Sequence, residues 1–439
     1  MKRKNKLIIG AVCVLAAGLA HPSAVFNAAA QDGRFVSRDE YQKLQREHEE
    51  LKQELQNIKA MLQGTAPKQT APDTAGGDKA DLTEPTKSSG DALSLSRYVF
   101  PGSTRFLLSG YGAAGFSALR HSDASFEAQF NPLLLWKLSD RLLFEGEMEF
   151  ELEDGETETK LEQAHLSYLL NDCMTFDAGK FLNPMNAFVE RYHMAWVNRL
   201  PDKPLAVYDG LLPETYVGAQ LRGGIPIGPT RLNYAAFVAN APRMINSIGS
   251  DDDLESLGTL DFDNFGNDGG HIASGGHIGF QPIPELEIGY GVHYSGLASS
   301  DDDALFHSVD INYVRDSDLL RGLIRLSGQW VWSQIGKGTY DNDGTPLVFD
   351  NDRDGGYAQI AYRPTKLSNN FIRQLEGVFR YDRFNQEDTP VGYDETRYTF
   401  GLNYWILPKT VFKVAYQIDE LSTSSPDSGG VLVQFATGF

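Results

Sequence analysis

Cysteine is almost absent from this chain, since only two of its 439 residues are cysteine. Cys13 lies in a predicted export signal, so Cys173 alone would remain in the mature protein and no intrachain disulfide is expected. Positive charge is also scarce, with 39 Lys and Arg against 59 Asp and Glu and a formal net charge of -20. A chain this acidic is not expected to bind nucleic acid.

A long apolar run is missing as well. The run from Leu7 to Ala20 is shorter than the ~20 residues that a membrane-spanning helix needs, and no later segment supplies another candidate. Lysine and arginine precede this run, and Ala28-Ala29-Ala30 follows it, which together form a secretory signal. We therefore assign residues 1–30 to a cleaved signal peptide and exclude a helical membrane protein.

Catalytic and metal-binding motifs are lacking too. The histidines of the mature region show no metal-ligand spacing, and no GxSxG nucleophile motif accompanies them. We expect no reaction, no cofactor and no metal site. A hydrolase with catalytic groups at the rim of a barrel remains an alternative, although no Ser, His and acid arrangement can be assembled from the sequence.

What the sequence has is alternation with a period of two. In the last segment, Val431, Val433, Phe435 and Phe439 share one face, and the chain ends on that aromatic residue. Such a strand faces lipid on one side and water on the other, as in an outer-membrane β-barrel.

Sixteen segments of this kind follow one another from about residue 98 onward. The fold class we predict is all-β, a transmembrane antiparallel β-barrel of about 16 strands. The expected strands are 104–118, 125–138, 141–153, 160–171, 174–183, 214–224, 230–241, 270–281, 285–296, 304–315, 322–335, 354–363, 372–384, 394–406, 410–420 and 429–439.

The connections between these segments alternate strictly in length. Short turns such as Ser139-Asp140 and Pro408-Lys409 alternate with long connections near 184–213, 242–269 and 336–353. This asymmetry is typical of periplasmic turns and extracellular loops.

Strand parity assigns the two faces. Tyr398, Phe400 and Leu402 alternate with Arg397 and Thr399, and a charged lipid face would cost about 2–4 kcal/mol per Arg or Lys near the midplane. The polar face therefore lines a lumen, and a barrel of this strand number is too wide for side chains to fill. We expect the pore wall to carry Arg222, Arg325, Arg380, Arg397, Lys413 and a ladder of Glu145, Glu147, Glu149 and Glu151.

The ladder would attract cations, but it can equally be a solvated wall paired with neighbouring basic residues.

The third extracellular connection, Pro184 to Pro213, is long and aromatic, so it is expected to bury its rings by folding into the lumen. An external lid or a subunit-contact loop is the alternative. If the connection folds inward, the charged residues that we assign to the pore constriction are Arg191, Arg199, Lys203, Glu190 and Asp202.

Two further parts precede the barrel. In residues 31–63, apolar residues recur at alternating steps of four and three from Tyr41 to Leu62, with His48 in the seam, which predicts a coiled coil of about three heptads. The alternative is a lone amphipathic helix packed on the barrel. Residues 64–97 are rich in Pro, Gly and Ser and predict a flexible linker, so the barrel domain takes up 98–439.

The segment Phe176 to Pro184, which closes a strand immediately before the third loop, and the terminal Phe439 resemble the trimeric diffusion porins. With its amino-terminal coil, the layout more closely resembles the phosphate-selective porin O and P family and the coiled-coil-bearing dicarboxylate porins. The resemblance implies a homotrimer in the outer membrane of a Gram-negative-type bacterium, with one pore per subunit, an inward third loop and basic residues that draw anions, phosphate or a dicarboxylate through.

The function we expect is passive diffusion of small hydrophilic, charged solutes through this porin, with outer-membrane lipid, further copies of the chain and the solutes as partners. The coil would lie in the periplasm and could contact the cell wall or another periplasmic partner. A structural tether acting through the coiled coil is therefore the main alternative.

Overall fold

The computed structural model describes residues 106–120, 123–153, 156–207, 211–249, 256–263, 265–267, 270–297, 302–386, 394–422 and 428–439. The predicted signal peptide, coiled coil and linker lie outside the described residues, so these three assignments stay predictions. Within the described residues, no helix is both long and apolar enough to cross a membrane.

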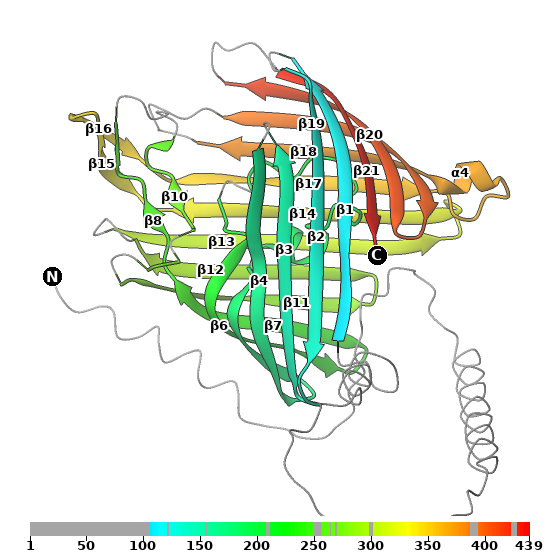
Figure 1. Cartoon of the computed structure of the whole chain (residues 1–439), viewed down its shortest axis with the longest axis horizontal. Coiled ribbons are helices and arrows are strands. Elements are labelled where there is room, and N and C mark those ends of the chain that lie inside the picture. Colours follow the sequence, from blue (N-terminus) through cyan, green and yellow to red (C-terminus); the bar gives the residue numbers. More distant parts are fainter. Residues whose placement is uncertain are drawn as a thin grey trace, which may run out of the picture. The chain divides into compact units, whose positions relative to one another are not determined.

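Sixteen antiparallel strands close into one barrel, as the sequence predicted (Figure 1). The ring closes where β1 pairs with β21, from Tyr111 opposite Gly438 to Leu119 opposite Gly430. The barrel strands are β1 (Phe106–Leu119), β2 (Ser125–Lys137), β3 (Leu142–Glu153), β4 (Glu156–Asn171), β5 (Met174–Leu182), β6 (Thr215–Ile227), β7 (Thr230–Asn240), β11 (Ile272–Ile283), β12 (Leu286–Gly296), β13 (Asp303–Ser317), β14 (Gly322–Gln334), β17 (Arg353–Arg363), β18 (Leu375–Asn385), β19 (Glu395–Leu407), β20 (Thr410–Leu421) and β21 (Ser428–Gly438).

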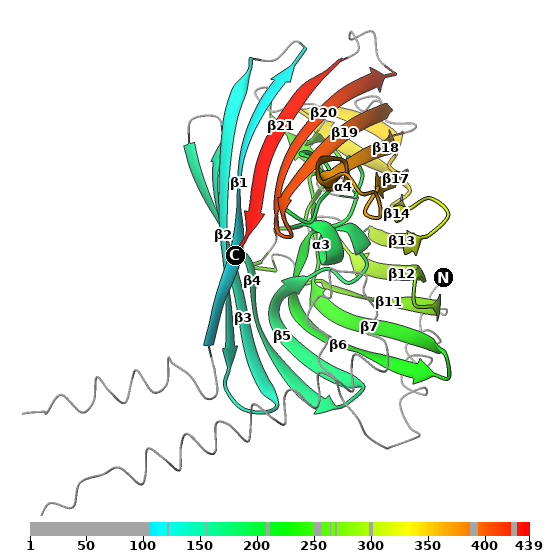
Figure 2. The same ribbon diagram turned by 90° about the vertical axis from the view of Figure 1, so that its right-hand side faces the viewer.

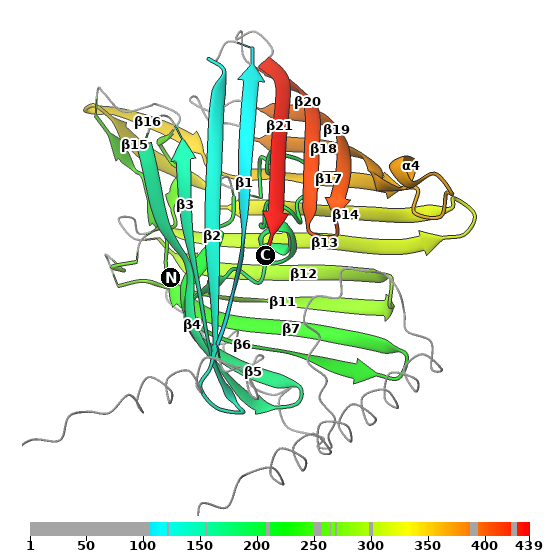
Figure 3. The ribbon, with the colours of Figure 1, turned by 45° about the vertical axis from the view of Figure 1, so that its right-hand side comes forward.

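Each strand is hydrogen-bonded to its neighbour in the sequence order, apart from the short loop strands that are skipped. Figure 3 shows the strands on the two sides of the barrel crossing at a steep angle, as strand tilt in a closed sheet requires. We call the end with the short turns the turn end, and the end with the long connections the loop end.

The outward face carries an apolar band. Along β20, the outward Phe412, Val414, Tyr416 and Ile418 are exposed, while the inward Val411, Lys413, Ala415, Gln417 and Asp419 are buried. The same alternation holds on β12 and β19. Continuous exposure of large apolar side chains around a barrel is the surface that lipid covers, so the predicted faces are confirmed.

The long connections contain structure that the periodicity did not predict. The connection after β7 holds β8 (Arg243–Met244), β9 (Ser247–Ile248) and β10 (Leu260–Asp261), and the connection after β14 holds β15 (Lys337–Asn342) and β16 (Thr345–Asp350). Strand β9 pairs in parallel with β15, through Ser247 opposite Asp341, and this pairing joins two loops that are far apart in the sequence.

Two short helices complete the described fold. Helix α4 (Asn370–Gln374) lies in the connection after β17, where the sequence predicted a turn followed by a strand from residue 372, so the strand begins three residues later than predicted, at Leu375. Helix α3 (Ala187–Tyr192) lies in the connection between β5 and β6, and Figure 2 shows it inside the ring of strands.

Prediction on the lipid face. Phe400→Arg, near the middle of the outward face of β19, should lower the free energy of unfolding by about 2–4 kcal/mol, because the guanidinium would lie in hydrocarbon. Leu407→Arg, at the end of the same strand, is the matched control and should cost about 0–1 kcal/mol. Urea titration of the protein folded into lipid vesicles measures both, and equal losses would argue against this membrane placement.

Candidate functional site: a loop fastened across the lumen

The third loop, residues 183–214, enters the barrel and begins with helix α3. Asn186 caps this helix, because its side-chain oxygen accepts from the Val189 N–H at 3.1 Å. The Asn186 amide nitrogen donates to the Val207 carbonyl oxygen at 2.5 Å, which brings the start and the return of the loop together. Residues 187–206 therefore form an excursion with adjacent ends.

Helix α3 is held on β14 by one side chain. The Gln329 amide nitrogen donates to the Met185 carbonyl at 2.7 Å, and the Gln329 oxygen accepts from the Phe188 N–H at 3.3 Å. Phe188 is buried against Tyr357 of β17, with the ring centroids 5.7 Å apart.

The charged residues of α3 reach other strands. Glu190 accepts from Arg222 of β6 at 2.6 Å, and Arg191 donates to Glu287 of β12 at 2.7 Å. The first pair joins Glu190 and Arg222, which the sequence placed in the constriction and the wall, and the second adds Glu287, which the sequence analysis did not single out. The adjacent Tyr192 hydroxyl donates to Asn312 of β13 at 2.6 Å.

His193 reaches the opposite wall. Its Nε2 lies 3.6 Å from a carboxylate oxygen of Glu147 on β3, and its Nδ1 lies 2.6 Å from the Val189 carbonyl. Burial by itself would lower the pKa of His193, but the contact with Glu147 and its charge outweigh burial and raise the pKa above its usual value. The imidazolium form is therefore favoured in this contact.

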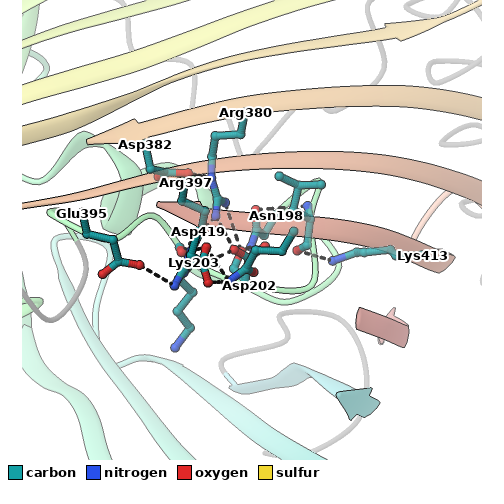
Figure 4. Close-up of polar contacts among 11 residues, drawn as sticks. Asn198, Asp202, Lys203, Arg380, Asp382, Glu395, Arg397, Lys413 and Asp419 are labelled. Atoms are coloured by element: carbon teal, nitrogen blue, oxygen red, sulfur yellow. Dashed lines mark hydrogen bonds and ion pairs between the residues drawn. The ribbon is translucent and has the colours of Figure 1, made fainter. Parts of the chain in front are cut away.

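After His193 the loop runs along β17 to β21 and β1. Figure 4 shows Asp202 at the centre of a charged network: it accepts from Arg380 of β18 at 2.6 Å and lies 3.7 Å from Arg397 of β19. Arg380 also pairs with Asp382 at 2.7 Å and donates to the Lys203 carbonyl at 3.0 Å. We call this group the loop latch, and Arg397 extends it to Glu395 and Asp419.

Lys413 and Arg199 fasten the segment between His193 and the loop latch. The Lys413 ammonium donates to the carbonyls of Ala195 and Leu200 at 2.5 and 3.2 Å. Arg199 lies 3.9 Å from Glu376 and stacks on the ring of Trp405, with 4.8 Å from its guanidinium carbon to the ring centroid. Both cations are buried, so their contacts stabilise the position of the loop.

Two wall glycines make room for the loop. A Cβ on Gly401 would collide with the Leu200 side chain, and a Cβ on Gly438 would lie 2.6 Å from the Trp196 ring nitrogen. Leu200 packs into a buried cluster with Ala361, Val378 and Ala415. The wall is thus shaped to the loop.

The glutamate ladder faces inward, but its members differ. Glu147 contacts His193 and accepts from Gln163 at 2.9 Å, and Glu149 accepts from Gln129 at 2.8 Å. Glu145 keeps 27% of its side chain exposed, 3.9 Å from His165. Glu147 therefore supports the loop, whereas Glu145 lies on a part of the wall that is open to water.

Sequence reasoning found the loop and its charged residues but not most of their partners. Their selectivity role stays a prediction, because the structure shows Arg199, Arg380 and Lys413 buried in contacts that hold the loop. The partners it missed are Glu287, Asn312, Gln329, Glu376, Asp382, Asp419 and His193. The period-two alternation of the strands is the signal that could have placed the strand residues among them on the lumen face.

The described residues contain no group of three or more His, Cys, Asp or Glu side chains placed to hold a metal ion. Cys173, in the turn between β4 and β5, is a free thiol.

Comparison with known proteins supports the expected resemblance. Residues 319–430, from the turn before β14 to the start of β21, match the model of the family described as phosphate-selective porin O and P. A search of curated proteins returns no match.

A search of solved structures also returns matches. An anion-selective porin from Comamonas acidovorans matches at 11% identity and a TM-score of 0.47, over 76% of this chain and 99% of that one. The outer membrane channel DcaP of Acinetobacter baumannii matches at 12% identity and a TM-score of 0.46, over 76% and 97%. The trimer form of the outer membrane protein OmpT of Vibrio cholerae matches at 11% identity and a TM-score of 0.47, over 76% and 99%.

Prediction on the loop latch. Asp202→Asn should lower the free energy of unfolding by about 1–3 kcal/mol, because it removes one of the two carboxylates that pair with buried Arg380 and leaves only Asp382. Limited proteolysis of the folded protein should then show cleavage within residues 194–206. The matched control is Asp318→Asn, because Asp318 is 97% exposed beside Lys366 on a turn, and this change should alter neither measurement. Equal protease resistance of Asp202→Asn and wild type would contradict the latch.

Prediction on His193. Because its pKa is raised in the folded protein, its contact with Glu147 stabilises the loop fully below the unfolded-state pKa of about 6.5 and loses that effect as pH rises through the raised value. Protease sensitivity of the loop should therefore increase with pH in the wild type. His193→Gln should remove this dependence, and an identical pH profile in both proteins would refute the role of this contact.

Proposed function

We propose that this chain is an outer-membrane porin, a passive diffusion channel for small hydrophilic solutes that is constricted by its third loop. The observation that carries the proposal is a loop of the barrel fastened across a polar lumen. The apolar outward band supports a place in the membrane, and the family match over residues 319–430 supports the porin class.

A ring of sixteen strands encloses more space than inward side chains fill. Here the loop crosses that space and is held on both sides, by His193 on β3 and by Gln329 on β14. These two strands are the third and the eleventh in the ring, so they lie on opposite sides of it. A loop that crosses the lumen in this way limits the width of the pore, and no separate domain is needed to do so.

Passive diffusion through a channel needs no catalytic group and no moving segment. The loop contacts are hydrogen bonds, ion pairs and packed apolar side chains, and they fix the loop in place while solutes pass. The uptake of anions, phosphate or a dicarboxylate expected from the resemblance depends on which charges line the route past the loop.

We also propose that the active form is a homotrimer, with the predicted coil in the periplasm. The porin resemblance supports the trimer, and the order of the predicted segments supports the placement of the coil. Deleting residues 32–62 separates this proposal from the tether alternative. Unchanged envelope behaviour with altered permeability would favour the porin role alone, whereas loss of the trimer or of envelope integrity with unchanged single-pore conductance would favour a tether.

Prediction on the constriction. Excision of residues 187–206, with Asn186 joined to Val207 by a short Gly linker, should raise single-channel conductance on the order of twofold or more, because it removes the crossing segment. The adjacent ends of the excursion make this deletion possible without stretching the remaining chain. Conductance of purified protein in planar bilayers is the measurement.

Two outcomes would count against the proposal. Absence of conductance in the wild-type protein would refute the porin function. Unchanged conductance in the excised variant, with the heat-modifiable electrophoretic shift of a folded barrel intact, would refute the constriction.

A further inference from the structure

At the loop end, packed apolar side chains fill one side of the lumen. The inward residues Phe181, Tyr216, Phe237, Phe306 and Val331, near the loop ends of β5, β6, β7, β13 and β14, are buried in one apolar cluster. The same cluster takes in side chains of three long connections, which are Ala206, Val207, Leu211, Leu212, Met244, Ile248, Leu257, Tyr340 and Phe349. A hydrophilic solute cannot enter through this side.

The other side of the loop end is polar. On β2 and β3 the inward Glu127, Gln129 and Glu151 are neither apolar nor fully buried. Gln129 also donates to Glu149 at 2.8 Å, so the wall formed by β2 and β3 is hydrophilic here. The entrance therefore lies over β1 to β4.

Below this entrance, the third loop fills the part of the lumen lined by β17 to β21 and β1. Leu200, Asp202 and Ala195 pack or pair with those strands, and the wall cations there are sealed, with Arg380 and Lys413 at 0% exposure. By contrast, Arg222 on β6 keeps 42% of its side chain exposed and Glu145 on β3 keeps 27%. The water-accessible gap past the loop therefore lies between α3 and β3 to β6.

Carboxylates outnumber cations along this route. Glu162 is the extra residue of a bulge in β4, where the register with β3 shifts between Glu147 and Met148. It lies in the field of Glu149, Glu214 and Lys180. Closer to the turn end, Arg222 lies in the field of Glu190, Asp177 and Glu145.

Several buried polar atoms near this gap lack a hydrogen-bond partner. They include the side-chain oxygens Asn131 Oδ1, Asp177 Oδ1 and Gln220 Oε1 and the ring nitrogens His165 Nδ1 and His193 Nε2. Because these atoms are both donors and acceptors and are buried, the preference for one sign of charge depends on the carboxylates named above.

We infer that the channel prefers cations, and that its route runs along β1 to β6, past an acidic gap formed by α3 and the walls of β3 to β6. The solute class is small cationic solutes, both inorganic cations and organic amines. This inference rests on the proposed porin function. The basic residues Arg199, Arg380 and Lys413 then hold the loop, and solutes do not meet them.

The first test is the reversal potential of the full-length protein in a planar bilayer across a potassium chloride gradient. Wild type should favour potassium. Glu145→Gln with Glu162→Gln should lower the potassium-to-chloride permeability ratio by about twofold or more, because two carboxylates leave the route. Glu420→Gln, a carboxylate on the outward face of β20, is the matched control and should leave the ratio unchanged.

The second test locates the route, in a Cys173→Ser background that removes the free thiol. A cationic methanethiosulfonate reagent should reduce the conductance of Glu145→Cys, because the added group narrows the gap. Glu420→Cys, modified outside the lumen, should conduct as before.

The outcomes separate the two proposals. A conducting channel that favours chloride, or a Glu145→Cys channel that modification leaves unchanged, would overturn the cation route while the porin function stands. A folded protein that conducts no ions would overturn the porin function and this inference with it.

Discussion

Closure of the strand ring is the constraint on which the rest of this structure depends. In hydrocarbon, every backbone N–H and C=O must find a partner within the protein, and pairing of β1 with β21 removes the last free edge. Closure also fixes the identity of the two faces of every strand, because parity cannot change without breaking the register. A lumen too wide for side chains then follows, and the third loop occupies it.

The loop is held by charged and polar contacts as well as by apolar packing. Arg380, Asp382 and Asp202 form a buried network, and a buried network of this kind gives little net stability but penalises any other position of the loop. The Lys413 ammonium satisfies two backbone carbonyls of a segment that has no regular secondary structure. These contacts specify where the loop lies, which is what a constriction requires.

Most of the barrel could be predicted from the sequence, because a period of two is a local signal. The predicted strand 410–420 corresponds to β20, Thr410–Leu421, in which Phe412 faces outward and Lys413 faces inward as expected. The partners of the loop could not be predicted in the same way. Asp202 and Arg380 are both visible in the sequence, but their contact joins residues 178 positions apart and depends on the path of an irregular loop. The loop strands β9 and β15, each shorter than a barrel strand, have no period long enough to detect.

The distance along the chain between the loop and its anchors sets an order of assembly. The third loop is part of the first half of the chain, yet Lys413, which binds its carbonyls, lies on the last strand but one. Contacts of such long range form late, after the intervening strands have paired. The loop can therefore reach its final position only when the carboxyl-terminal strands are in place, and until then its segment 195–200 lacks the Lys413 contacts that hold it. Folding of the loop thus depends on completion of the barrel.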